Sequence, residues 1–102
     1  MTTEKWFAYR GFQQLLMISN ELNRAQNALE NEDIAHAICA WERAFELTDL
    51  TVEDKKNERL LTELLRFREM LGETFITHDK EMNRSLMKEL IRLDPEAYRL
   101  MC

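Results

Sequence analysis

Apolar residues recur every three or four positions along most of this chain, which is the spacing of one face of an α-helix. The pattern predicts a first helix over about residues 4–30 and a second helix over about residues 34–48. The polar residues 30–33 (ENED) separate them. The apolar row of the first helix contains Ala8, Phe12, Leu15, Ile18, Leu22, Ala25 and Leu29, with Gly11 inside the helix. The row of the second contains Ile34, Ala37, Ile38, Trp41, Ala44, Phe45 and Thr48.

The same periodicity continues from about residue 52 to residue 93 without a proline. A helix of this length would be roughly 60 Å long at about 1.5 Å per residue, and Gly72 and residues 77–79 are the places where we expect it to bend. Asp94 and Pro95 then mark the start of a short helical stub over residues 95–102. Short connections favour antiparallel neighbours. The predicted fold is therefore all-α: a single domain over residues 1–102, built as an antiparallel three-helix bundle with a long third helix and a short C-terminal helical stub.

The third predicted helix carries more apolar surface than one core-facing stripe needs. Its main stripe contains Leu60, Leu64, Phe67, Leu71, Phe75, Met82 and Leu86. A second, displaced stripe contains Leu61, Leu65, Ile76, Met87 and Leu90. This second stripe either contacts another helix of the bundle or binds an amphipathic helix of a partner protein. In the second case we expect Met17 and Leu47 to join the partner-binding residues and Ala40 to border the groove, while Ile34, Ile38, Trp41 and Phe45 lie in the core.

The C-terminal stub places Ala97, Leu100 and Met101 on one face of a short helix, with Tyr98 beside them. A helix this short is not stable alone in water. We therefore expect these four residues to act as a weak lid over the second stripe, in competition with a partner.

Composition narrows the class of protein further. The chain has only 2 Gly and 1 Pro, which fits an all-helical fold, and its net charge of −5 disfavours nucleic acid as a partner. No apolar run is long enough to insert into a membrane, and the N-terminus has no secretory signal pattern. Cys39 and Cys102 are expected to be free thiols, so the sequence favours a cytoplasmic protein.

No residue set predicts a reaction, and we expect neither an enzyme nor a bound cofactor. Asp33, His36 and Cys39 follow one another at three-residue spacing, but a structural zinc site needs four ligands, so no metal is expected. His78 lies on the apolar seam and is expected to be a hydrogen-bonded histidine in the core or at its boundary. The basic row of Lys80, Arg84, Lys88 and Arg92 is either a solvated helix face or a docking surface for an acidic partner.

Two long segments carry a resemblance to a known family. The segment LLMISNELNRAQNALENEDIAHAICAWERAFEL (residues 15–47) and the segment LLRFREMLGETFITHDKEMNRSLMKEL (residues 64–90) are similar to the helices of the FliT family, the flagellar export chaperones of the filament-cap protein. In the second segment, the matching positions are Asp79, Glu81, Met82, Leu86 and Met87. A related type III secretion chaperone would show the same resemblance.

The resemblance implies a small cytoplasmic chaperone or adaptor without enzymatic activity. Such a protein binds an amphipathic helix of an export substrate and keeps it unassembled. The alternative is a structural helical homodimer, or an interaction module without a chaperone role, that buries the second stripe on another surface.

Overall fold

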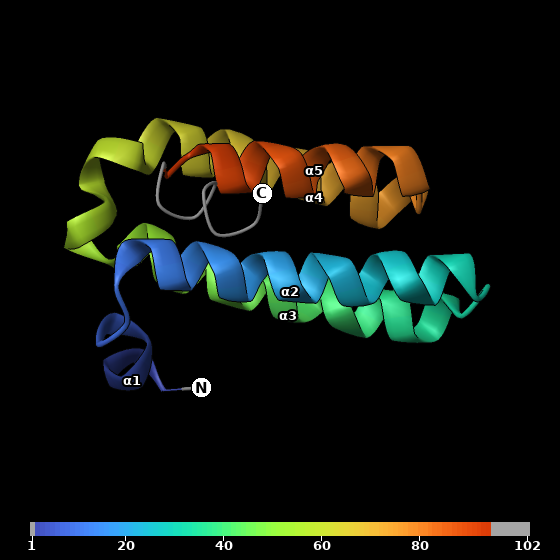
Figure 1. The fold of residues 1–102 in the computed structure, drawn as a ribbon, viewed down its shortest axis with the longest axis horizontal. Helices are drawn as coiled ribbons and strands as arrows, with labels where there is room; N and C mark the ends of the chain where they lie inside the picture. Colours follow the sequence, from blue (N-terminus) through green and yellow to red (C-terminus); the bar gives the residue numbers. More distant parts are fainter. Residues whose placement is uncertain (1, 95–102) are drawn as a thin grey trace.

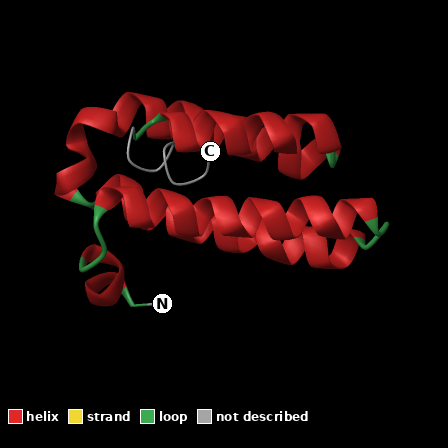
Figure 2. Cartoon of the chain, in the orientation of Figure 1, coloured by secondary structure: helices red, strands yellow, loops and turns green. Residues whose placement is uncertain are grey.

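The protein is all-helical, as predicted. The computed structural model describes residues 2–94, and that part of the chain contains helices and no strand (Figure 2). The elements are α1 (Thr3–Phe7), α2 (Gly11–Glu30), α3 (Ile34–Glu53), the 3-10 helix η1 (Lys55–Leu60), α4 (Leu61–Thr77) and α5 (Lys80–Arg92).

The four long helices form a bundle of two antiparallel hairpins. Figure 1 shows the α2–α3 hairpin lying along the α4–α5 hairpin, with η1 turning the chain from one hairpin to the other. α2 packs on α3 and α5, and α4 packs on the same two helices, so each long helix has two neighbours. The described part of the molecule measures 37 × 28 × 21 Å.

The predicted long third helix is wrong. A continuous helix over residues 52–93 would exceed the 37 Å length of the molecule, and the chain instead reverses between α4 and α5. His78 adopts the left-handed conformation at φ 57° and ends α4. Asp79 then caps α5, its carboxylate accepting hydrogen bonds from the amides of Glu81 at 2.9 Å and Met82 at 3.3 Å. Of the two predicted bends, residues 77–79 form the break and Gly72 lies inside α4. The three-helix arrangement is therefore replaced by the two hairpins.

The first two predicted helices also begin or end at residues other than those predicted. The helix expected over residues 4–30 is broken at residues 8–10, and Gly11 is the first residue of α2 rather than an interior position. The break is stabilised locally, because the Arg10 amide donates a hydrogen bond of 2.9 Å to the Gln13 side chain. α3 extends beyond the predicted end at 48, and the Thr51 hydroxyl donates to the Leu47 carbonyl within the helix at 2.7 Å.

The core contains most of the apolar rows predicted for α2 and α3, the two helices of the first hairpin. In α2 the buried members are Leu15, Ile18, Leu22, Ala25 and Leu29. Trp41 in α3 is fully buried, which confirms its predicted place, and Ile38 and Phe45 pack against the core half-buried. Ile34 was predicted in the core but is 39% exposed, since it lies in the first turn of α3. Ala40, predicted at the border of a groove, is buried.

Each tryptophan donates its indole N–H to a buried polar side chain. The Trp41 indole donates to the Asn83 side-chain oxygen at 2.9 Å, and the Asn83 amide donates to the Leu22 carbonyl at 3.0 Å. These bonds join α3, α5 and α2. The Trp6 indole donates to the Thr51 hydroxyl at 3.1 Å, which joins α1 to α3. Buried polar groups with matched partners fix the helices in one arrangement.

A second polar cluster holds the end of the bundle where α2, α3 and η1 meet. The buried Gln14 amide donates to Asp54 at 2.9 Å and to the Trp6 carbonyl at 3.0 Å. Asn57 donates to the Gln14 side-chain oxygen at 2.8 Å. Desolvation raises the pKa of Asp54, but hydrogen bonds from Lys56 and Gln14 outweigh it, so the net pKa of this carboxyl is lowered. The carboxylate form is therefore the one that this corner of the bundle stabilises.

The C-terminal stub and membrane insertion were also the subject of predictions. The predicted stub and lid (Ala97, Tyr98, Leu100 and Met101) lie outside the described residues. Among residues 2–94, none of the helices combines the length and the apolar character that crossing a membrane requires.

Candidate functional site

The most exposed large apolar side chains of residues 2–94 lie on α3 and α4. They are Ile34 at 39%, Leu61 at 39%, Leu65 at 45% and Ile76 at 79% exposure. Isolated exposed apolar residues are common on protein surfaces, but several on neighbouring helices indicate a contact surface. The side of the bundle that carries α3 and α4 is therefore the first candidate for a binding site.

The apolar residues on α4 share one side of the helix, which we call the α4 face, and Arg68 and Glu69 stand in its seven-residue gap. It consists of Leu61, Leu65, Gly72 and Ile76, at spacings of four, seven and four residues that keep them on one side of the helix. A different side of α4 supplies Leu64, Phe67 and Leu71 to the core. α4 thus has two apolar sides, and the bundle covers one of them.

Aromatic rings fill the seam between the α4 face and α3. The Phe45 and Phe75 rings meet edge to face with centroids 5.8 Å apart. The Arg68 guanidinium lies 5.5 Å from the Phe45 ring centroid and donates a hydrogen bond of 2.6 Å to Asp49. The hydrogen bond and the charge of Asp49 raise the pKa of Arg68. This pair ties α4 to α3 across the seam and leaves the apolar row beside it uncovered.

The predicted partner-binding residues do not all come together. Leu61, Leu65 and Ile76 lie together on the α4 face, as predicted for the second stripe. Met87 lies on α5, in a small depression of about 230 Å³ between α5 and α2 that also involves the buried Ser19. Met17 lines a separate cleft between α2 and α3.

Two of the predicted partner-binding residues are corrected. Leu90 is fully buried in the core. Leu47 is also buried, at 3% exposure, although it lines the same cleft as Met17. The error at Leu90 has a physical cause: one helical wheel over residues 52–93 assumes one helix axis. After the reversal at His78, positions that continue the stripe of α4 lie on a different helix with different neighbours.

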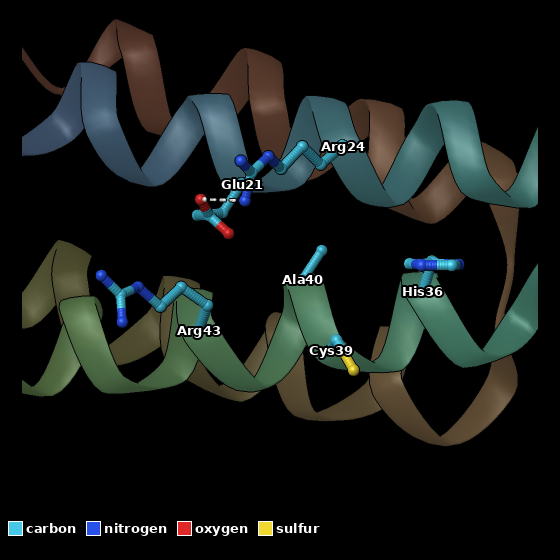
Figure 3. Close-up of a pocket in the computed structure, with 6 residues that line it drawn as sticks. All are labelled: Glu21, Arg24, His36, Cys39, Ala40 and Arg43. Atoms are coloured by element: carbon cyan, nitrogen blue, oxygen red, sulfur yellow. Dashed lines mark hydrogen bonds and ion pairs between the residues drawn. The ribbon is translucent and has the colours of Figure 1, made fainter.

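A cleft of about 750 Å³ lies between α2 and α3 (Figure 3). Its lining residues are Glu21, Arg24, His36, Cys39, Ala40 and Arg43. The Arg24 guanidinium donates to one oxygen of Glu21 at 3.3 Å, and the other Glu21 oxygen is buried without a hydrogen-bond partner. Ala40 is the buried apolar residue of this lining.

The polar groups around this cleft are held by neighbours on their own helix. Asp33 accepts a hydrogen bond from the His36 amide at 3.2 Å and contacts the His36 ring, and these two bonds lower the pKa of Asp33. His36 is thus oriented by Asp33 rather than by Cys39, which is exposed. Among residues 2–94, no group of three His, Cys, Asp or Glu side chains is placed to hold a metal ion.

Arg84, of the basic row on α5, and His78 both contact other helices of the bundle. Arg84 bonds both Glu81 at 2.7 Å and Glu30 at 3.2 Å, which ties α5 to the end of α2. His78 is half-buried, and its ring stacks on Trp41 with centroids 5.5 Å apart. His78 therefore lies at the boundary of the core, which is one of the two positions predicted for it.

Comparison with known protein families, curated proteins and solved structures finds no match for this chain. The α4 face is therefore interpreted from its own geometry.

Proposed function

We propose that this protein binds an amphipathic helix of another protein on the α4 face. The observation that supports the proposal is the row of Leu61, Leu65 and Ile76, which are 39%, 45% and 79% exposed on a helix whose other side is already buried. Helices recognise grooves and faces of this kind through apolar residues at three- and four-residue spacing. The row spans sixteen residues of α4, from Leu61 to Ile76, which gives a partner helix about four turns to contact.

The role we propose is that of a small cytoplasmic chaperone or adaptor, which keeps the bound helix of an export substrate unassembled until it is delivered. The helix-binding part of this role rests on the α4 face. The export part rests on the resemblance of residues 15–47 and 64–90 to the flagellar export chaperones of the FliT family. The competing function is a structural homodimer in which the α4 face is buried on a second copy.

Substitution of the α4 face tests this function. We expect Ile76→Asp and Leu65→Asp to weaken partner binding by roughly ten-fold or more, because a carboxylate would be buried unpaired in the complex. The matched control is Ser85→Asp, which introduces the same charge at an exposed position of α5. Each protein is used as bait in its native cell extract, and its melting temperature is measured alongside.

A partner held by the wild type and by Ser85→Asp, but lost by Ile76→Asp at an unchanged melting temperature, supports the proposal. Exposed positions tolerate substitution within about 0.5 kcal/mol, so Ile76→Asp should remain folded. Loss of the helical signal in Ile76→Asp would assign the side chain to the core and contradict the proposal. A wild-type dimer that Ile76→Asp separates would favour the structural homodimer instead.

A further inference from the structure

Exposed carboxylates border the apolar surface of α3 and α4. On α3 they repeat at spacings of four, three and four residues, and on α4 they lie four residues apart. We call this set the acidic margin; it contains Glu42, Glu46, Asp49, Glu53, Glu69 and Glu73. Asp49 reaches Arg68 on α4, so its row lies on the α4 side of α3. Glu69 follows Leu65 by four residues and therefore lies next to the α4 face.

Most of this negative charge is not neutralised within the described residues. Asp49 is paired with Arg68 at 2.6 Å, and Glu46 is 3.9 Å from Arg43. The other four members of the margin form no ion pair within residues 2–94: Glu42, Glu53, Glu69 and Glu73. The only other cation on α3 or α4 is Arg66. A binding surface bordered in this way favours a partner of positive charge.

Gly72 adds a second, independent feature at the centre of the α4 face. A glycine inside a helix costs about 1 kcal/mol relative to alanine. No packing within residues 2–94 requires it, because a Cβ added at Gly72 would meet nothing within 4 Å. Gly11 differs, since a Cβ there would lie 3.1 Å from the Asn57 side-chain oxygen. Gly72 therefore leaves a notch between Leu65 and Ile76 that is open to the outside.

We infer that the occupant of the α4 face is an amphipathic helix whose apolar stripe is flanked by Lys or Arg, and that it crosses α4 with a bulky side chain over Gly72. This inference rests on the proposed function and specifies the chemistry of the partner. A second copy fits less well, because a two-fold contact through this face would bring one acidic margin against the other.

Two synthetic helices test the charge requirement. Both are about 18 residues long with the same leucine stripe, and the flanks carry Lys in one and Glu in the other. Calorimetric titration of the full chain at about 0.05 M salt should give roughly ten-fold tighter binding of the Lys-flanked helix, since several exposed ion pairs together amount to about one decade of affinity. At about 0.5 M salt the difference should largely disappear through screening.

Variants of the protein test which residues cause the preference for the Lys-flanked helix. Glu69→Lys should weaken binding of the Lys-flanked helix several-fold, by roughly 3–10 times, because it reverses a charge next to the α4 face. The control Glu63→Lys makes the same change on the other side of α4, where Glu63 borders Phe67 and Met70, and should have a smaller effect. Gly72→Ala should weaken binding by roughly ten-fold and yet raise the melting temperature by about 2–6 °C, because alanine favours the helix.

The outcomes separate the two proposals. Equal binding of both helices, or tighter binding of the Glu-flanked helix, would overturn the charge inference and leave helix binding intact. Unchanged affinity in Gly72→Ala, together with a raised melting temperature, would overturn the crossing at Gly72. If neither helix binds, both this inference and the proposed function fail.

Discussion

Replacing Trp41 with alanine is expected to lower the free energy of unfolding by about 3–5 kcal/mol, the range for a buried large aromatic side chain. Trp41 is fully buried and packs against the Phe75 ring at 6.3 Å and the His78 ring at 5.5 Å. The substitution also removes the donor to Asn83, which is itself buried on α5. Both hairpins of the bundle therefore lose contacts at once. Urea denaturation followed by circular dichroism measures the loss.

Trp41→Phe separates the two contributions. Phenylalanine keeps most of the ring volume but cannot donate to the Asn83 side-chain oxygen, and an unsatisfied buried acceptor costs about 1–3 kcal/mol. We therefore expect Trp41→Phe to lie between wild type and Trp41→Ala. A urea midpoint of Trp41→Ala close to that of wild type would show that this side chain is exposed and that the orientation of α3 is wrong.

Replacing Trp6 with alanine is expected to cost a similar amount, about 3–5 kcal/mol. Although α1 is a single short helix near the N-terminus, Trp6 is fully buried, and its indole donates to Thr51 on α3. Its carbonyl accepts from the buried Gln14 amide, and its ring contacts Tyr9 with centroids 5.9 Å apart. The substitution would therefore open a cavity at the corner where α1, α2 and α3 meet.

Phe7→Ala is the matched control for Trp6→Ala. Phe7 is adjacent in the sequence and only half-buried, so its removal should lower the urea midpoint by clearly less. If the two variants unfold at the same urea concentration, Trp6 does not anchor the N-terminal segment to the bundle.

The sequence predicts the helical class and much of the core because both depend on local periodicity. Leu15, Ile18 and Leu22 recur at the helix spacing and are buried, and Trp41 lies where its row places it. Asn31 and Asp33 both stand before the apolar row of α3 as possible caps, and the structure uses Asp33, whose carboxylate accepts from the His36 amide.

The reversal between α4 and α5 is harder to read because it takes only two residues, His78 and Asp79. The apolar spacing continues almost unbroken across them, so periodicity alone does not distinguish one long helix from a tight hairpin. His78 adopts the left-handed conformation, and its ring stacks on Trp41, far away in the sequence. The Asp79 cap was the local signal for the break.

The burial of polar residues also could not be predicted from the sequence pattern. Gln14 and Asn83 are fully buried, although a helical wheel assigns polar residues to the solvent. Their partners Asp54 and Trp41 lie forty or more residues away, so only the fold reveals the pairing. For the candidate site, the excess apolar width correctly identified Leu61, Leu65 and Ile76 as a separate row. The regular acidic spacing on α3 was visible in the sequence, but its relation to this row required the packing of α3 on α4.

The central claim is that the α4 face binds a helix, and methyl resonances in solution test it most directly. The full chain, with labelled leucine and isoleucine methyl groups, is titrated with the Lys-flanked amphipathic helix. The account predicts that the resonances of Leu61, Leu65 and Ile76 shift in proportion to binding, while those of the buried Leu22 and Leu86 stay in place. Shifts confined to Ile91 on the α2–α5 side, with the α4 face unchanged, would contradict it.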